Sequence, residues 1–275
     1  MTDFEFFKMS GHGNDFIFVD NWDGKIKVED MPGLAKALCR RRISVGADGL
    51  VFLEEGPPEV DFSWRFFNSD GSEAEMCGNA ARCAALFANL TGIAPAEMSF
   101  MTKAGVINAV VAQSSVKAQL TAPGLPEMDY SLEINGQAWT FSSLNTGVPH
   151  AVAWVDDIDA VAVVEVGRAV REHAKFKPAG ANVDFVKVLG PDQVAVRTYE
   201  RGVEGETLAC GTGAAAAVLL SAKKGLVKSP AKVLTRGGED LTIHFTLTAD
   251  GFGDVFLEGP VRVVYTAKLG PDALK

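Results

Sequence analysis

The chain contains an internal repeat, and this repeat constrains the fold more than any other feature of the sequence. Three short motifs occur twice, in the same order and at an offset of 133 or 134 positions: Gly13 with Gly147, Gly46-Ala-Asp48 with Gly180-Ala-Asn182, and Cys77 with Cys210. Self-similarity at a fixed offset is typical of a duplicated architecture. We therefore expect two copies of one structural unit.

The apolar pattern of each half predicts strands with a few helices. Stretches such as Phe16–Asp20 and Ala151–Val155 have the composition of strands bounded by turns. A run rich in Ala follows each of the repeated Cys residues and predicts a helix. We predict an α+β fold of two pseudo-symmetric duplicated domains, each a curved, mostly antiparallel sheet wrapped around a central helix. The active site is expected in the cleft between them.

The domain boundary is expected at the turn-rich segment Thr121–Pro126, which combines Pro and Gly. Such clusters of structure-breaking residues mark loops and linkers. The N-terminal domain is predicted over residues 1–122 and the C-terminal domain over residues 123–265. The tail 266–275 is a candidate to rejoin the N-terminal domain.

The composition indicates a globular protein and argues against several function classes. The net charge of −9 and the pI near 5.0 disfavour a nucleic-acid partner. No apolar run approaches about 18 residues, so no membrane partner is expected, and the N-terminus lacks the pattern of a signal peptide. We expect a cytoplasmic protein with four reduced Cys. Their spacing contains no CxxC, so no metal site is expected.

Cys77 and Cys210 are each predicted to stand directly before the N-terminus of a helix. In the second copy, Thr212 is the predicted N-cap residue. The N–H groups and dipole at such an end stabilise an anion, so the pKa of each thiol is expected below about 8.5. The alternative is a small apolar Cys that fills a core, and Cys39 and Cys83 fit that interpretation. The Gly-rich turns and the repetition argue against it for the pair.

Two thiols on opposite sides of one carbon suit removal of a proton from one face and its return to the other. One Cys must start as thiolate and its partner as thiol. The N–H groups of Gly78-Asn79-Ala80 and Gly211-Thr212-Gly213 can bind an α-carboxylate, while Glu200 can pair with an α-ammonium.

A redox disulfide, a phosphate-binding loop and a pyridoxal phosphate enzyme are the competing interpretations. The chain lacks the P-loop motif and a Lys in suggestive surroundings, and facing Cys residues with substrate between them are too far apart to bond.

Five segments together resemble the diaminopimelate epimerase family. They are GHGNDF at Gly11–Phe16, FNSDGSEAEMCGNAARC at Phe67–Cys83, GVPH at Gly147–His150, GANVDF at Gly180–Phe185 and YERGVEGETLACGTGA at Tyr199–Ala214. The match spans nearly the whole chain, and the two long Cys segments in this order make it highly specific. The resemblance implies a cytoplasmic enzyme without cofactors that interconverts LL- and meso-diaminopimelate, on the way to lysine and peptidoglycan precursors.

The resemblance also implies roles for individual residues. Cys77 and Cys210 would be the acid/base pair. Arg201 fits the distal carboxylate of the substrate, because a guanidinium binds a carboxylate through two parallel hydrogen bonds. His150 would either support one Cys or satisfy a turn. A homodimer is compatible with the sequence. The residues that would bind the substrate are Asn14, Asn68, Gly78, Asn79, Asn182, Glu200, Arg201, Gly211 and Thr212.

Some positions depart from the commonest pattern of the family. Val148 stands where many members have Asn, and Gly49 stands where many have Gln. His12 replaces a usual Leu, and the second Cys loop is one residue longer at Gly202–Glu206. These departures put the distal substrate contacts in question and leave the proton chemistry intact.

Two alternative functions stay open at this point. One is a racemase for another amino acid, such as proline or histidine. Proline racemases usually carry Cys-Gly-His where this chain has Cys77-Gly-Asn79. The other is an amino-acid-binding protein without catalysis, which would have no reason to keep both thiols.

Overall fold

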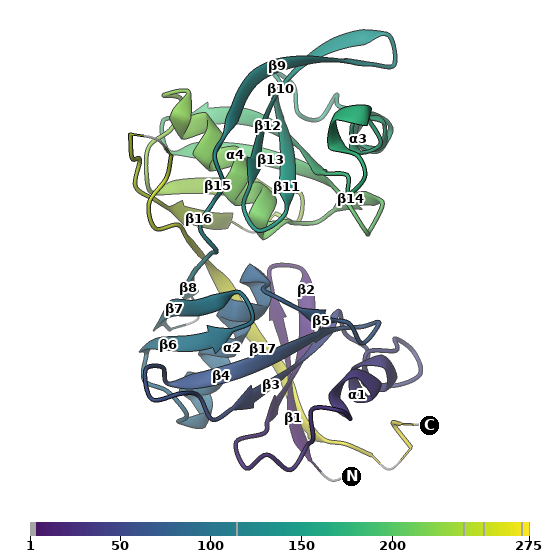
Figure 1. Cartoon of the computed structure of the whole chain (residues 1–275), viewed down its shortest axis with the longest axis vertical. Helices are drawn as coiled ribbons and strands as arrows, with labels where there is room; N and C mark the ends of the chain where they lie inside the picture. Colours follow the sequence, from purple (N-terminus) through teal and green to yellow (C-terminus); the bar gives the residue numbers. More distant parts are fainter. Residues whose placement is uncertain (1–3, 114, 239, 250, 271, 275) are drawn as a thin grey trace. The chain divides into compact units, whose positions relative to one another are not determined.

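The computed structural model describes residues 4–113, 115–238, 240–249, 251–270 and 272–274. Within these residues the fold is mixed α+β, with mostly strands and four α-helices (Figure 1). The chain divides into two compact units. Unit 1 comprises Met1–Gln119 and Gly259–Lys275, and unit 2 comprises Leu120–Glu258. The C-terminal segment thus belongs to unit 1 from Gly259 onward, rather than from residue 266.

Unit 1 alternates strands with two helices. Its strands are β1 (Glu5–Gly11), β2 (Asn14–Asp20), β3 (Gly49–Glu54), β4 (Phe62–Asn68), β5 (Glu73–Ala74), β6 (Glu97–Thr102), β7 (Gly105–Ala112) and β8 (Ser115–Gln119), and its helices are α1 (Met31–Leu38) and α2 (Gly78–Thr91). Most of β17 (Phe256–Lys268) also belongs to this unit. It pairs antiparallel with β1, from Glu5 opposite Lys268 to Gly11 opposite Val261.

Unit 2 is built in the same way. Its strands are β9 (Glu127–Ile134), β10 (Gln137–Asn145), β11 (Pro149–Trp154), β12 (Asn182–Gly190), β13 (Gln193–Glu200), β14 (Gly205–Thr207), β15 (Ala231–Thr235), β16 (Asp240–His244) and the start of β17. Its helices are α3 (Val163–Arg171), the short 3₁₀ helix η1 (Ala174–Phe176) and α4 (Gly211–Lys223).

The two units have the same connectivity. An antiparallel hairpin is followed by a helix, a parallel strand and an antiparallel strand, as β1–β2–β3–β4 and as β10–β11–β12–β13. The fourth strand of each series then pairs antiparallel with a short strand and parallel with the strand after the second helix. The parallel pairings differ by one residue, because Phe16 lies opposite Gly49 whereas its counterpart His150 lies opposite Asn182, the counterpart of Asp48.

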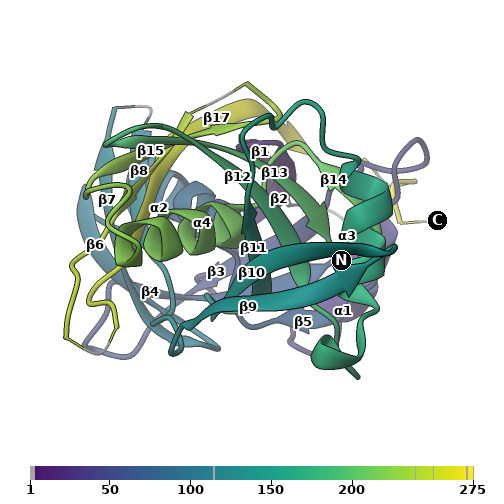
Figure 2. The same ribbon diagram turned by 90° about the horizontal axis from the view of Figure 1, so that it is seen from above.

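The second helix of each unit is buried along most of its length. Residues Gly78–Ala88 of α2 and residues Gly213–Ala222 of α4 are all buried. A helix that is apolar all round belongs in a core rather than on a surface, and its many Ala side chains allow strands to approach closely. Figure 2 shows α4 running lengthwise with strands of unit 2 on either side of it.

The first helix of unit 1 covers the opposite face of the same strands. Phe16 and Phe18 of β2 pack in the core that contains α2, whereas Ile17 and Val19 pack in the core that contains α1. This division follows from the alternation of side chains along a strand. These strands therefore lie between α1 and α2. The segment that follows β5 leads to the start of α2.

Some element ends differ from those expected. The sequence of Met31–Arg42, with Pro32 near its start and basic residues at its end, favours one helix, but the helix ends at Leu38, because the chain turns back and the N–H of Gly46 donates to the Leu38 carbonyl at 2.8 Å. The alternating segment Met98–Leu120 suits two strands but forms parts of three, with a turn directly before Gly105, where φ is +110°. The short strands β5 and β14 were not expected.

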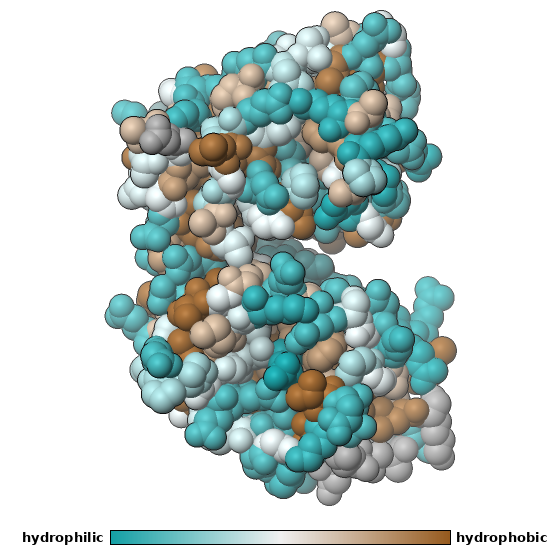
Figure 3. All heavy atoms as spheres, in the orientation of Figure 1, coloured by the Kyte–Doolittle hydropathy of each residue, from teal (hydrophilic) through white to brown (hydrophobic). Residues whose placement is uncertain are grey.

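The face of the molecule shown in Figure 3 is mostly hydrophilic, as expected when the hydrophobic side chains pack in internal cores. On the face shown in Figure 3, hydrophilic residues predominate and hydrophobic residues form small separate groups. In the part of the chain that the structure describes, no helix combines the length and the apolar character needed to cross a membrane.

Candidate active site

Cys77 is the N-cap residue of the buried helix α2. Its backbone is extended, with φ −147° and ψ 119°, and its carbonyl accepts the N–H of Ala81 at 2.8 Å. The N–H groups of Gly78 and Asn79 fall in the first turn, where a helix offers them no carbonyl of its own. The thiol is half-buried. A thiol and a set of free amide donors thus meet at one helix end, as expected.

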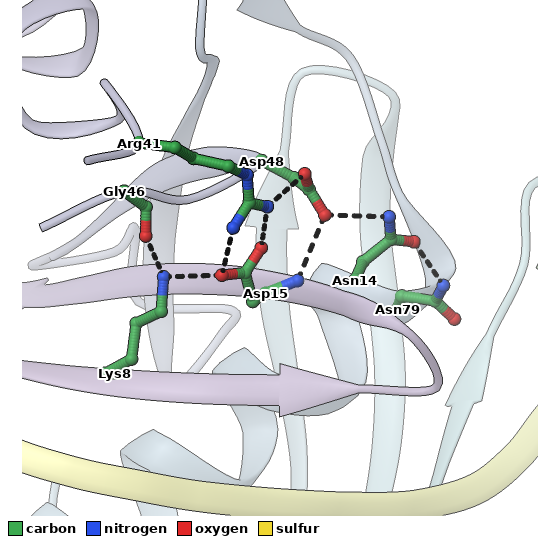
Figure 4. Close-up of polar contacts among 7 residues, drawn as sticks. All are labelled: Lys8, Asn14, Asp15, Arg41, Gly46, Asp48 and Asn79. Carbon is green, nitrogen blue, oxygen red and sulfur yellow. Dashed lines mark hydrogen bonds and ion pairs between the residues drawn. The ribbon is translucent and has the colours of Figure 1, made fainter. Parts of the chain in front are cut away.

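Asn14 and Asn79 are in direct contact in unit 1. Asn79 Nδ2 donates to Asn14 Oδ1 at 2.7 Å, and Asn14 Nδ2 donates to Asp48 Oδ2 at 3.0 Å (Figure 4). The contact depends on Gly11 in β1. A Cβ at that position would lie 2.9 Å from the Asn79 carbonyl oxygen and 2.9 Å from Cys83 Sγ. The absence of a side chain at Gly11 therefore lets β1 approach α2 where the two amides meet.

An ion cluster is joined to these amides through Asp48, and its other members are Lys8, Asp15 and Arg41. Lys8 Nζ lies 2.7 Å from Asp15 Oδ2 and also donates to the Gly46 carbonyl. Arg41 bonds both Asp15 and Asp48, and its Nη2 lies 2.8 Å from Asp48 Oδ1. Burial acts to raise the pKa of Asp15, but hydrogen bonds from Arg41 and Lys8 outweigh it and hold this pKa below its usual range. Figure 4 shows the cluster reaching from Lys8 to Asn79.

Asn68, the other amide expected in unit 1, stabilises its own turn. It ends β4 opposite Gly49, and its Nδ2 donates to Ser72 Oγ at 3.0 Å. Gly49 is closely packed, since a Cβ there would lie 2.4 Å from the Phe66 ring. A larger residue at position 49 does not fit this backbone without movement of Phe66.

Cys210 occupies the equivalent place in unit 2. It is the N-cap residue of α4, with φ −126° and ψ 112°, so the prediction of Thr212 as N-cap was wrong. The Cys210 carbonyl accepts the N–H of Ala214 at 2.8 Å, which starts the helix two residues earlier than expected. The Thr212 hydroxyl is used differently. Its Oγ1 lies 3.4 Å from Cys210 Sγ and 3.0 Å from His150 Nε2.

His150 connects this hydroxyl to a buried carboxylate. His150 Nδ1 lies 2.7 Å from Asp184 Oδ2, and the Thr198 hydroxyl donates to Asp184 Oδ1 at 2.7 Å. A carboxylate only accepts, so the ring hydrogen sits on Nδ1 and leaves Nε2 to accept from Thr212 in the neutral ring. Gly213 allows this packing, because a Cβ there would lie 2.3 Å from Asp184 Oδ1.

The pKa of Cys210 is raised rather than lowered. Burial is the main cause, and the carboxylates of Glu200 and Asp184 add to it. A hydrogen bond from the Thr212 hydroxyl, when it turns from His150 to the sulfur, and one from the Gly213 N–H act in the opposite direction but are outweighed. The expectation of a lowered pKa was therefore wrong for Cys210. It considered the stabilisation of a thiolate by the helix N-terminus, but not the effects of burial and of the nearby carboxylates, which raise the pKa. The surroundings of Cys210 therefore favour its thiol form.

The remaining residues expected in unit 2 surround the same helix end. Asn182 Oδ1 accepts the backbone N–H of Arg201 at 2.8 Å, and its Nδ2 lies 3.3 Å from His150 Nε2. The Arg201 guanidinium donates to the carbonyls of Ala179 at 3.2 Å and Gly180 at 3.4 Å. His150 thus belongs to a side-chain network and does more than satisfy a turn.

Two carboxylates of the site were not among the expected residues. Asp184 is a charged residue inside the apolar strand β12, and this placement is a signal that sequence alone could have provided. Asp48 is the repeat counterpart of Asn182, as the last residue of Gly46-Ala-Asp48. Asn182 was among the expected site residues, so the repeat could have identified Asp48 as a site residue too.

The sequence of the chain is similar to a known family over most of its length. The family model described as diaminopimelate epimerase matches residues 6–123 and 142–264. A diaminopimelate epimerase from Aquifex aeolicus is 46% identical, with 98% of this chain and 99% of the relative covered. One from Hydrogenobaculum sp. is 45% identical, with 95% and 97% covered.

Solved structures share the fold at low sequence identity. A hydroxyproline epimerase from Agrobacterium vitis matches with a TM-score of 0.73 at 16% identity, covering 99% of this chain and 94% of its own. A probable proline racemase from Agrobacterium radiobacter matches with a TM-score of 0.72 at 14% identity, covering 98% and 95%.

Proposed function

The chain belongs to the diaminopimelate epimerase family of lysine biosynthesis, and from this premise we propose that it interconverts LL- and meso-diaminopimelate by two-base proton transfer between Cys77 and Cys210. The observation that carries the proposal is that each Cys is the N-cap residue of a buried helix at the same point of the same connectivity. A duplicated unit supplies one acid/base residue per copy.

The two thiols have complementary protonation states. A thiolate removes the α-proton from one face, and a thiol delivers a proton to the other, so the reaction needs one of each. The raised pKa of Cys210 favours the thiol form there, so the proposal takes Cys77 as the thiolate of the free enzyme. After one turnover the roles are exchanged, and the pair titrates as a coupled system. No cofactor is required, because the thiols supply both proton positions.

The reaction requires that the two thiols act on opposite faces of one α-carbon. We therefore propose that the units are pseudo-symmetric copies and that their helix ends approach the substrate from either side, in a cleft between them. The shared connectivity supports this arrangement. Backbone N–H groups of Gly78-Asn79 and Gly211-Thr212 would bind the α-carboxylate and stabilise the charge that develops as the proton leaves.

The other contacts follow from charge and position. Glu200 is close enough to Cys210 to raise its pKa, which suits pairing with the α-ammonium next to the reacting carbon. Arg201 would bind the distal carboxylate, and Asn14, Asn68 and Asn182 would donate and accept hydrogen bonds around the substrate. The tight packing of Gly49 excludes a longer side chain there, so the distal end depends more strongly on Arg201.

Proton exchange tests the reaction and the substrate together. Purified, reduced protein is incubated in heavy water with LL-diaminopimelate, and NMR follows deuterium at the α-carbon and formation of the meso isomer. Proline and histidine run in parallel. Exchange with either of these, and not with diaminopimelate, would move the substrate assignment.

Two Cys variants test the mechanism. Cys77→Ala and Cys210→Ala should both abolish epimerisation, since each removes one of the two proton positions. Retained epimerisation in either variant would exclude the two-base mechanism.

A further inference from the structure

The amide pair at the start of α2 is the middle of a hydrogen-bond chain with a charged group at each end. Asp48 accepts from Asn14, Asn14 accepts from Asn79, and Asn79 Oδ1 accepts from Arg82 Nη2 at 2.9 Å. Part of the chain is drawn in Figure 4. Arg82 is fully buried, Asn79 is buried, and Asn14 and Asp48 are half-buried. Hydrogen bonds in such a place are stronger than in water.

The charged ends determine the direction of every bond between them. A carboxylate only accepts and a guanidinium only donates. Asn14 must therefore turn its NH₂ group to Asp48, and Asn79 must turn its carbonyl oxygen to Arg82. The two remaining groups, Asn14 Oδ1 and Asn79 Nδ2, then meet as acceptor and donor at 2.7 Å. Turning either amide around breaks two bonds at once, so each amide has one orientation.

Both oxygens of Asp48 are needed for this. Oδ2 accepts from Asn14 at 3.0 Å and from the backbone N–H of Asp15 at 3.1 Å, while Oδ1 accepts from Arg41 at 2.8 Å. An amide at position 48 has only one accepting atom. If that atom faces Arg41, an NH₂ group faces the NH₂ group of Asn14, and the direction of the chain is lost. If it faces Asn14 instead, an NH₂ group faces the Arg41 guanidinium, and the charged bond that holds residue 48 in place is lost.

Unit 2 contains a hydrogen-bond chain of the same kind. The second residue of α4, Thr212, contacts His150, and His150 contacts the carboxylate of Asp184. In both units, the second residue of the helix behind the N-cap Cys is tied to the neighbouring strands through a chain that ends on an acid. The repeat has therefore kept the arrangement while exchanging the residues that form it.

We infer that Asp48 is a positioning residue for the substrate: through Asn14 it holds Asn79 and the first turn of α2 in the one orientation that binds the amino-acid head group. This inference rests on the proposed function, because it assigns the two amides to the same diaminopimelate site. Asp48 acts through Asn14 and touches neither the substrate nor the reacting atoms.

The test is a double-mutant cycle on kcat/KM for LL-diaminopimelate. Asp48→Asn is nearly isosteric and should lower kcat/KM by about tenfold or more, mainly through a higher KM, because the amides lose a charged hydrogen-bond partner. In protein that already carries Asn14→Ala, the same change should cost less than about twofold, because Asp48 is then no longer linked to Asn79. A purely structural role of Asp48 predicts equal losses in both backgrounds.

Asp15→Asn is the matched control. It removes a carboxylate from the same ion cluster but leaves the bond between Asp48 and Asn14 in place. Its kcat/KM should stay within about twofold of wild type, since the oriented amide survives. Thermal melts of all variants show that each is folded at the assay temperature. A loss in Asp15→Asn as large as that in Asp48→Asn, or additive losses in the cycle, would overturn the inference.

Failure of this inference is distinguishable from failure of the proposed function. A wild type that does not turn over diaminopimelate contradicts the function alone. Side-chain amide signals of Asn14 and Asn79 in NMR then test the chain without activity. Their NH₂ protons should exchange slowly with water in wild type and at least about tenfold faster in Asp48→Asn, since exchange follows local opening. Unchanged exchange would overturn the inference.

Discussion

His150 and Asp184 form a buried pair in which the ring Nδ1 lies 2.7 Å from a carboxylate oxygen, and neither side chain is exposed to solvent. The pair fixes the tautomer of the ring that faces the Thr212 hydroxyl, 3.0 Å away. The environment of Cys210 is therefore determined by a residue of β12, in a distant part of the sequence.

Asp184→Asn should lower kcat while changing the fold little. The amide NH₂ can donate to Nδ1, which moves the ring hydrogen to Nε2 and leaves the Thr212 hydroxyl without its acceptor. We expect a loss of about tenfold to a hundredfold in kcat, the scale of a buried hydrogen bond to a charged group. Steady-state kinetics measure it. Thr198→Val, which removes only the donor to the other oxygen of Asp184, should cost clearly less.

Gly213→Ala should destabilise the protein. The new Cβ would lie 2.3 Å from Asp184 Oδ1, and overpacking in a close-packed core costs about 1–3 kcal/mol. Chemical denaturation measures the free energy of unfolding. Gly33→Ala is the matched control, because Gly33 lies in the helix α1 with open space where its Cβ would be. That change should be neutral or stabilising by up to about 1 kcal/mol. Equal effects at the two sites would contradict the packing argument.

Stability should decline in alkaline solution. Burial raises the pKa of Cys39 to about 12 and that of Cys83 to about 12, from an ordinary value of 9.0. Below the ordinary value both states carry the proton, and no stability is lost. As the pH rises from about 9 toward 12, the unfolded chain releases these protons first and becomes favoured. Denaturation at several pH values tests this, and a Cys83→Ala variant should show a shallower decline.

Alkylation of the native protein should separate the four Cys residues. At pH 8, iodoacetamide should leave Cys39 and Cys83 unmodified, because both are buried with a raised pKa. Cys77 should react before Cys210, whose raised pKa keeps it protonated. Mass spectrometry of peptides after timed quenching gives the order. Faster labelling of Cys210 would contradict the assignment of the thiol form to it.

Asp15 should contribute stability that disappears in acid. Its pKa is held below the usual range by Arg41 and Lys8 against the effect of burial. The contribution is present above the ordinary pKa of 3.8 and is lost as the pH falls through the lower folded value. Wild type should therefore exceed Asp15→Asn in unfolding free energy at pH 7, and the difference should shrink below about pH 4. A difference independent of pH would show that the charge is not its source.

The repeat in the sequence predicted much of the fold. It identified two units with equivalent Cys residues at helix ends, and the connectivity of the described residues repeats accordingly. What local pattern could not predict arises from contacts between distant segments. The N-cap position depends on which carbonyl accepts the first helical N–H. Here the Cys210 carbonyl accepts it, although the side chain of Thr212 is of the type that N-caps prefer.

The same limit explains the site. The raised pKa of Cys210 depends on burial first and then on Glu200 and Asp184. Burial and the approach of Asp184 are not visible near position 210 in the sequence. In the sequence Asp48 is only the last residue of a repeated motif, and its role depends on its contact with Asn14, which lies far from it in the chain. The expected roles of Asn68, Asn182, Glu200 and Arg201 stay predictions that kinetics of the variants can test.

The strand β17 has a consequence for how the protein is made. From Gly259 onward it is synthesised after all of unit 2, yet it pairs along the whole length of β1, which precedes unit 2 in the chain. The sheet of unit 1 is therefore completed only after all of unit 2 has been translated. Until then β1 has an unpaired edge, and a chain that stops before Gly259 lacks the strand that covers it.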